Sequence, residues 1–292
     1  MSLMKMIKLI ESKKEFDDLC DYLNEKSLIT LDTEFERRNT YFAILSLIQI
    51  GVSADEIYVI DVLKVQDVTA IKKVLFNPEI KKVIHSLYQD IEIFYHIFHD
   101  VPVNLYDTQT AAEAANLSRS ISYFELVKQI CNVTLNKEMQ KCDWMQRPLT
   151  TEQIEYAAFD VQFLFKIYDH LEHQLYKFSK IELFKSMMIK HHHTKTYAIN
   201  YEDAWKKVAF HRSESLEKKM RFFAALREEM AAQENVPRGH FLSDQDLIKI
   251  CQHLPISVDA LDKLGLASKF MRNTKYKNKI VTMCLGYLES AQ

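Results

Sequence analysis

Apolar and polar residues alternate in two different ways along the first third of the chain. Short apolar runs bounded by polar residues predict strands, and apolar residues spaced three to four positions apart predict amphipathic helices. The predicted strands cover 27–35, 43–51, 56–63 and 80–85, and the predicted helices cover 11–26, 68–76 and 90–98. Because the two kinds of element are interleaved, we expect an α/β fold, a mixed sheet flanked by helices.

From residue 108 onward the pattern is helical. Helices are predicted over 108–117 and 121–132, and one long helix over 150–178 opens with Thr150-Thr151-Glu152-Gln153, a typical helix start. Apolar periodicity lapses between residues 190 and 200, and the remainder again predicts amphipathic helices. We therefore expect two domains, at 4–192 and 200–292, the second a small all-α bundle.

Composition is typical of a folded protein outside the membrane. Hydrophobic residues make up 48% of the chain, which is ample for a core, yet no stretch of about 18 apolar residues occurs. The N-terminal segment becomes charged too early for a signal peptide. These features predict a cytoplasmic protein with no membrane association, and we expect a monomer.

Cysteine and glycine usage excludes several kinds of site. The five cysteines are scattered and never form a C-x-x-C pair, so neither a disulfide framework nor a zinc site is indicated. With four glycines in total, the chain contains neither of the glycine-rich motifs that hold phosphates through backbone amides. Any phosphate chemistry must therefore depend on side chains and metal ions.

Charge divides unevenly between the two predicted domains. The net charge is −2, but from residue 201 onward 15 basic residues outnumber 12 acidic ones, giving +3 there and −5 in the remainder. The acidic part contains Asp32 and Glu34 at the end of a predicted strand. Since residues two apart in a strand point to one side, these carboxylates converge, which is consistent with a cation site or with a solvated acidic turn.

Two further acidic positions have the same ambiguity. Asp90 starts a predicted helix directly after a buried strand, as a functional carboxylate or a helix cap would. Tyr156 and Asp160 are four residues apart, so they stack on one helical face. The aromatic residues around them form an apolar stripe typical of a core.

Together the four carboxylates point to metal-dependent chemistry. A dry cluster of Asp32, Glu34, Asp90 and Asp160 would repel itself, whereas two hard divalent cations about 3.5–4 Å apart require such oxygen ligands. A cation pair of this kind stabilises both oxygens of an in-line phosphoryl displacement, and the Tyr156 hydroxyl can position the attacking water.

These residues carry a resemblance to a known family. D-x-E in "LDTEFERRNTYFAILSLIQIG", H-x4-D in "HSLYQD" and Y-x3-D in "YAAFD" occur in the order found in DEDDy 3′–5′ exonucleases, and "YDTQTAAEAA" and "CDWMQRPLTTEQIEYAAFDVQFL" resemble the ribonuclease D family. The later segments "EDAW", "LREEMAAQENVPRGHFLSDQDLIKICQHLP" and "LDKLGL" resemble its HRDC module. The resemblance implies a ribonuclease H-like sheet followed by an HRDC bundle.

The resemblance also implies a function and a set of site residues. Asp32, Glu34, Asp90 and Asp160 would bind two Mg²⁺ or Mn²⁺ ions, and Tyr156 would complete the catalytic set by orienting the water. The expected activity is two-metal-ion release of 5′-mononucleotides from RNA 3′ ends, in the maturation of transfer RNA precursors and other stable RNA. Substrate contacts are expected at Thr33, Phe35, Gln49 and His85.

Other positions have less specific interpretations. A basic stretch with two aromatic residues, Lys269, Phe270, Arg272, Lys275, Tyr276, Lys277 and Lys279, fits nucleic-acid binding or an exposed helix face equally well. The histidine triplet at 191–193 lies in a predicted linker and is not expected to bind metal. Two alternatives to the exoribonuclease remain: a DNA 3′–5′ exonuclease, since the carboxylates do not distinguish the polymers, and a non-catalytic nucleic-acid-binding module.

Overall fold

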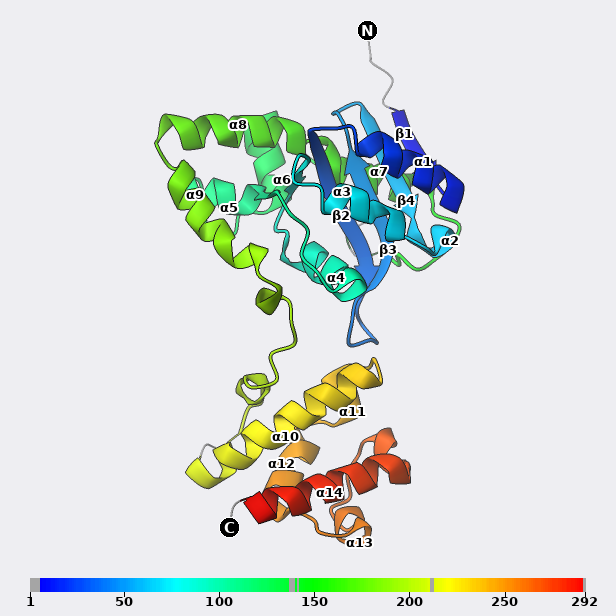
Figure 1. Cartoon of the computed structure of the whole chain (residues 1–292), viewed down its shortest axis with the longest axis vertical. Helices are drawn as coiled ribbons and strands as arrows, with labels where there is room; N and C mark the ends of the chain where they lie inside the picture. Colours follow the sequence, from blue (N-terminus) through cyan, green and yellow to red (C-terminus); the bar gives the residue numbers. More distant parts are fainter. Residues whose placement is uncertain (1–5, 137–139, 141, 211–212, 291–292) are drawn as a thin grey trace. The chain divides into compact units, whose positions relative to one another are not determined.

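The computed structural model describes residues 6–136, 140, 142–210 and 213–290. The chain forms two compact units, the first made of residues up to 36 and 43–198, the second of residues 37–42 and 199 onward. Figure 1 shows their elements in colours that follow the sequence. The outer limits that we expected for the two domains, residues 4 and 292, lie outside the described residues.

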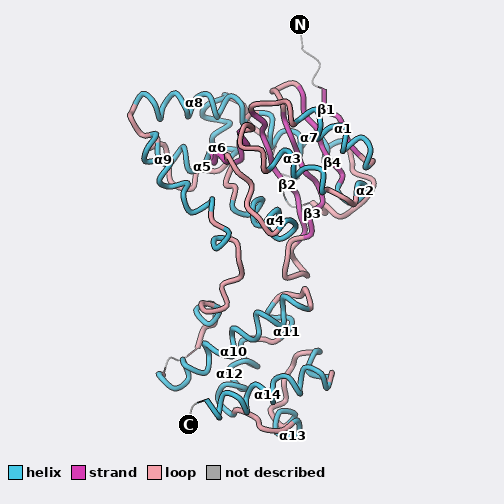
Figure 2. The backbone as a smooth tube through the Cα atoms, in the orientation of Figure 1, coloured by secondary structure: helices cyan, strands magenta, loops and turns pink. Residues whose placement is uncertain are grey.

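A six-stranded mixed sheet forms the centre of the first unit (Figure 2). Its strands are β1 (Met6–Ile10), β2 (Leu28–Glu36), β3 (Ile44–Gly51), β4 (Glu56–Asp61), β5 (Lys81–Ile84) and β6 (Leu105–Asp107). Their order is β1-β4-β3-β2-β5-β6, with β3 antiparallel to both β2 and β4 and the other pairs parallel. The expected mixed sheet is confirmed, and the structure adds two short edge strands, β1 and β6.

Helices surround this sheet. They are α1 (Lys13–Leu23), α2 (Val62–Val65), α3 (Lys72–Leu75), α4 (Tyr88–Phe98), α5 (Thr108–Ala114), α6 (Tyr123–Leu126), α7 (Thr151–Gln162), α8 (Leu164–Lys177) and α9 (Ile181–Met188). The prediction of one helix over 150–178 is wrong, because two helices, α7 and α8, cover this segment and meet at Phe163. α7 packs on β2, β3 and β4, whereas α8 packs on α5 and β5, so the break lets one segment cover two parts of the unit.

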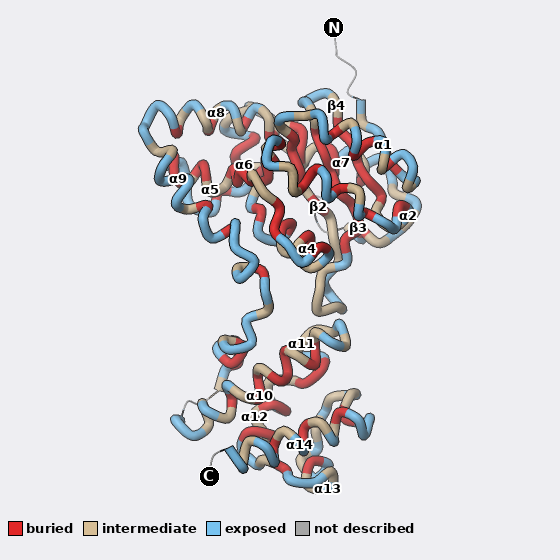
Figure 3. Tube along the Cα trace, in the orientation of Figure 1, coloured by how far each residue is buried: buried red, intermediate tan, exposed pale blue. Residues whose placement is uncertain are grey.

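Successive strand residues, which point to opposite faces of the sheet, are both buried, as expected for a sheet covered on both faces. Leu47, Ile48 and Ile50 of β3 and Ile29 and Leu31 of β2 are all fully buried. Figure 3 shows this buried region running through the strands of the first unit. Among the described residues, no helix is long and apolar enough to cross a membrane.

The second unit is helical, which confirms the expected bundle. Its helices are α10 (Glu214–Gln233), α11 (Arg238–Phe241), α12 (Asp244–His253), α13 (Val258–Asp262) and α14 (Thr274–Ser290). Phe223, Phe241 and Ile280 belong to its core, which is separate from the core of the first unit. Residues 37–42 belong to this unit, and the Tyr41 hydroxyl donates to Glu228 at 2.6 Å.

Candidate active site

Strand β2 carries the first two acidic residues of the site. Asp32 and Glu34 alternate with Thr33, so both carboxylates point to one face of the sheet and Thr33 to the other. β2 is an interior strand, hydrogen-bonded to β3 on one side and β5 on the other. At Asp32 and Glu34 the strand pairs with β3 alone, since its pairing with β5 ends at Thr30, and the ladder with β3 holds the two carboxylates close together.

Asp160 reaches the same point from α7. Thr150 caps this helix: its hydroxyl accepts the Gln153 N–H at 3.2 Å, and the Gln153 side chain accepts the Thr150 N–H at 3.0 Å. Because Ala157 and Ala158 are small and fully buried, α7 can pack closely on the sheet. Carboxylate oxygens of Asp32, Glu34 and Asp160 consequently lie within 4.8 Å of one another.

Asp90 lies beside this group rather than within it. Helix α4 begins at Tyr88, ahead of the expected start, so Asp90 sits in the first turn and is not the cap residue. Its carboxylate is buried and accepts a hydrogen bond from the Thr33 hydroxyl. The Asp90 charge raises the pKa of Asp32, Glu34 and Asp160, so Asp90 lies within electrostatic range of all three.

Burial and mutual repulsion dominate the electrostatics of these carboxylates. Burial raises the pKa of Glu34 to about 9, of Asp160 to about 8 and of Asp90 to about 7, and it raises the pKa of Asp32 well above its usual range. None of the main causes of these four shifts is a described lysine or arginine. A set of oxygen donors that lacks a protein cation fits hard divalent metal ions such as Mg²⁺, Mn²⁺ or Ca²⁺.

Tyr156 lies one helical turn before Asp160. It is largely buried, and its ring centroid is 6.0 Å from that of Trp144. Burial is the main cause that raises its pKa above the usual range, and the charges of Asp160, Glu34 and Asp32 add to the shift. The hydroxyl therefore stays protonated at neutral pH beside the carboxylates, where it can hold a water molecule.

The four expected substrate contacts differ in accessibility. Thr33 is buried and bonded to Asp90, and Gln49 is fully buried opposite Asp32 in the strand register. Phe35 is half-buried against the core. His85 is half-buried, its Nδ1 lies 2.9 Å from the Thr108 hydroxyl, and burial lowers its pKa to about 4.

The basic stretch of the second unit is largely structural. Lys277 pairs with Asp262 at 2.6 Å and Lys279 with Glu229 at 3.2 Å, which neutralises both cations. Tyr276 is buried and packs edge-on against Phe241. This arrangement favours the helix-face interpretation of the stretch. Within the described residues, the histidine triplet belongs to no group that could hold a metal ion.

Sequence analysis missed a buried ion pair near the site. Arg147 donates from Nε to Asp61 at 2.6 Å and from Nη2 to the same carboxylate at 2.8 Å. It also donates to the carbonyl of Trp144 at 2.7 Å, and Ser46 donates to that carbonyl as well. Asp61 is the one acidic residue within the apolar part of the strand predicted over 56–63, and this buried acid was the available signal.

Comparison with known proteins agrees with this geometry. A family model described as 3′–5′ exonuclease matches residues 7–176, and a model described as HRDC domain matches residues 221–283. Curated proteins named Ribonuclease D are 32% identical in Acidiphilium cryptum (90% of this chain, 67% of the relative) and 33% identical in Bartonella henselae (91% and 66%). The chain thus spans about two thirds of the length of these relatives.

Solved structures show the same fold. The crystal structure of Escherichia coli RNase D, described as an exoribonuclease involved in structured RNA processing, superposes with a TM-score of 0.85 at 26% identity, over 96% of this chain and 75% of that one. The catalytic core of RRP6 from Trypanosoma brucei superposes with a TM-score of 0.71 at 22% identity, over 100% of this chain and 82% of that one.

The mixed sheet, the acidic site and the first family model together define a hydrolytic 3′–5′ exonuclease, followed by an HRDC domain. Within this class, the curated relatives named Ribonuclease D are 32% identical to this chain over 89–90% of its length, which identifies the family. The chain belongs to the ribonuclease D family. The family and the fold expected from the sequence motifs are therefore confirmed.

Proposed function

We propose that this protein is a 3′–5′ exoribonuclease that removes 5′-mononucleotides from RNA 3′ ends. The observation that carries the proposal is the meeting of carboxylate oxygens from β2 and α7 within 4.8 Å, without a neutralising lysine or arginine among the described residues. Relatives named Ribonuclease D support RNA as the polymer. Transfer RNA precursors in the cytoplasm are the proposed substrates, and the proposed acting form is a monomer.

Asp32, Glu34, Asp90 and Asp160 would hold two divalent cations, Mg²⁺ or Mn²⁺. When bound, these ions stabilise charge on the attacking and leaving oxygens of the phosphodiester. Thr33 fixes the orientation of the Asp90 carboxylate through its hydroxyl hydrogen bond. The carboxylates supply the negative charge that such cations need, and their fixed backbone positions avoid the cost of ordering them during reaction.

Tyr156 is the proposed water-orienting residue. Its neutral hydroxyl has both a donor and an acceptor function, so it can hold the attacking water in line with the phosphorus. We assign the terminal nucleotide to the surface around Thr33, Phe35, Gln49 and His85. His85 is neutral, so it contributes a hydrogen bond rather than charge, and the buried Thr33 acts by orienting the Asp90 carboxylate. Gln49 contributes through its backbone, which pairs opposite Asp32 in the sheet.

The test compares RNA and DNA of one sequence, each single-stranded and labelled at the 5′ end, with Mg²⁺, Mn²⁺ or a chelator. We expect metal-dependent shortening of the RNA from its 3′ end, with 5′-mononucleotides as the products. Faster shortening of DNA would favour the DNA exonuclease. Failure to cleave either polymer, under conditions where the chain is folded, would favour the non-catalytic binding module.

A further inference from the structure

Two short helical turns follow α9 in the first unit, 3-10 turns at Ile189–His192 and Thr194–Thr196. Thr196 closes them on each other: its hydroxyl donates to the Lys190 carbonyl and its N–H donates to the His193 carbonyl at 2.9 Å. The turns form an open hollow of about 570 Å³, which we name the 190–196 hollow. It is lined by Lys190, His192, His193, Thr194, Lys195 and Thr196.

The charged residues that line the 190–196 hollow are all positive. Lys190 and Lys195 are exposed, no carboxylate lines the hollow, and neither lysine pairs with an acid in the part of the chain that the structure describes. Burial lowers the pKa of His192, so the two lysines supply the positive charge at neutral pH. Two unpaired ammonium groups beside hydroxyl and imidazole donors suit the phosphates of a nucleic-acid backbone.

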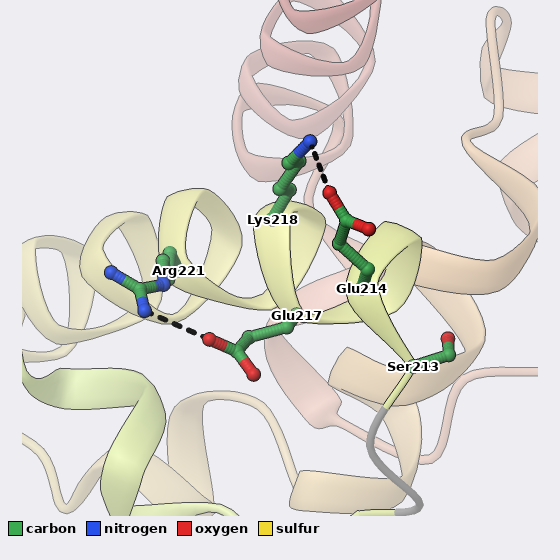
Figure 4. Close-up of a pocket in the computed structure, with 5 residues that line it drawn as sticks. All are labelled: Ser213, Glu214, Glu217, Lys218 and Arg221. Carbon is green, nitrogen blue, oxygen red and sulfur yellow. Dashed lines mark hydrogen bonds and ion pairs between the residues drawn. The ribbon is translucent and has the colours of Figure 1, made fainter.

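A second hollow of similar size carries no net positive charge. It lies at the start of α10 and is lined by Ser213, Glu214, Glu217, Lys218 and Arg221 (Figure 4). Here Lys218 pairs with Glu214 at 2.9 Å and Arg221 with Glu217 at 2.8 Å, one helical turn apart. Both cations are neutralised within the helix, so this hollow offers no net charge to a phosphate.

Aromatic packing holds the 190–196 hollow in place on α4. Tyr197 is almost fully buried, its ring centroid is 5.4 Å from that of Tyr88 and 6.2 Å from that of Tyr95, and its hydroxyl donates to the His191 carbonyl at 3.2 Å. The lysines therefore project from an ordered segment, which lowers the entropy lost when they bind.

Tyr88 links the hollow to helix α4, the helix that also carries Asp90. Its side chain is 42% exposed, and its hydroxyl donates to the Thr196 carbonyl at the edge of the hollow. Tyr88 is also the first residue of α4, and Asp90 lies in the same turn. An RNA strand whose 3′ end occupies the carboxylate site would pass an exposed aromatic ring, on which a base can stack, before it reaches the lysines.

We propose that the 190–196 hollow binds the sugar-phosphate backbone of single-stranded RNA upstream of the nucleotide being removed. The proposal deepens the proposed function and rests on it for the identity of the polymer. A track outside the cleavage site retains the shortened strand after each cycle, because it contacts nucleotides that have not yet been removed.

The test measures binding without hydrolysis. In the full chain carrying Asp160→Asn, fluorescence anisotropy follows a single-stranded RNA of about 12 nucleotides, a length within the range of single-strand binding sites in proteins. Lys190→Gln with Lys195→Gln is compared with Lys64→Gln with Lys73→Gln, which removes the same charge from two lysines paired with Glu11 and Asp21. A dinucleotide, which fills only the carboxylate site, serves as the short ligand.

For the hollow variant we expect the salt dependence of log affinity to become shallower by about 1.4, since each neutralised phosphate of a single strand contributes about 0.7. That change of slope corresponds to a roughly 25-fold loss of affinity at about 0.1 M salt relative to 1 M. Dinucleotide binding should not change, and the control variant should bind the longer RNA nearly as the parent does.

Three outcomes would overturn the proposal: a hollow variant that binds like the control, an equal loss for the dinucleotide, and a loss confined to single-stranded DNA. Failure of this proposal can be distinguished from failure of the proposed function. A parent chain that cleaves no RNA, yet binds the longer RNA through these lysines, would refute the nuclease assignment and support the hollow.

Discussion

The carboxylates of Asp32, Glu34 and Asp160 show how strongly single residues depend on their neighbours. An isolated aspartate ionises near pH 4, but these half-buried groups lie close together and their pKa values are raised. Without a cation the protein must keep some of them protonated. Together the three carboxylates therefore form a binding site for a cation, a property that none of them has alone.

Asp160→Asn should lower the hydrolysis rate by roughly 100-fold or more, because the amide keeps the shape but removes charge that stabilises the transition state. Asp90→Asn should behave in the same way. Single-turnover rates on 5′-labelled RNA measure the effect, and thermal unfolding should show that neither variant is less stable than the parent. Near-parental rates in both variants would contradict the metal assignment.

Tyr156→Phe should reduce kcat by roughly 100-fold, the low end of what a positioned proton-transfer group contributes. Only the water-orienting hydroxyl is lost, and the ring can still pack beside Trp144. We therefore expect KM to stay unchanged in steady-state assays. A kcat equal to that of the parent would remove Tyr156 from the mechanism.

At the scale of elements, the segment before α7 decides where Tyr156 and Asp160 lie. Arg147 binds Asp61 at the end of β4 through two hydrogen bonds, and both side chains are largely buried. The same arginine holds the Trp144 carbonyl, so Trp144 is fixed where its ring meets Tyr156. The ion pair thus fastens the start of α7 to the sheet.

Arg147→Gln should destabilise the first unit by about 3–5 kcal/mol, because it leaves the Asp61 charge buried without a partner. The double variant with Asp61→Asn should recover part of this loss. Urea unfolding followed by Trp144 fluorescence measures it. Lys64→Gln, which breaks the exposed pair with Glu11, is the control and should cost about 0–1 kcal/mol. Equal losses in the two single variants would argue against the fastening role.

At the scale of the whole molecule, the chain has two separate cores, and each contains one of its two tryptophans, Trp144 and Trp205. Each tryptophan therefore reports on its own unit. Metal binding should act on the first unit alone, since a ligand stabilises only the structure that binds it.

Without metal, the first unit should become less stable as the pH rises from about 4 to about 9. Its carboxylates have raised pKa values, about 7 for Asp90, 8 for Asp160 and 9 for Glu34, so the folded state holds protons that the unfolded state has released. The stabilising contribution of these carboxylates is complete below their pKa values in the unfolded state. It is lost as the pH rises through their higher pKa values in the folded state. Urea midpoints of Trp205→Phe protein, read from Trp144 with a chelator present, measure this.

Mg²⁺ added at high pH should restore the midpoint read from Trp144. In Trp144→Phe protein, the midpoint read from Trp205 should respond to neither metal nor this pH change. Metal-free stability of the first unit that rises with pH would show that the carboxylates are not buried together.

The sequence by itself determined four of the six described strands, β2 to β5, and pointed to the five candidate site residues. Strand alternation put Asp32 and Glu34 on one face, and helical spacing put Tyr156 above Asp160, because both follow from local backbone geometry. Motif order then indicated the family, which the matches confirm. Their catalytic roles stay predictions until the variants are measured.

Only the tertiary structure decided features that depend on contacts between distant segments. The break at Phe163, the pairing of Arg147 with Asp61 and the bond from Thr33 to Asp90 join residues with no shared local pattern. The 190–196 hollow likewise needs Tyr197 to pack on α4 before its lysines form one surface. Periodicity records which face of an element is buried, whereas the partner that covers this face is set by packing of the whole chain.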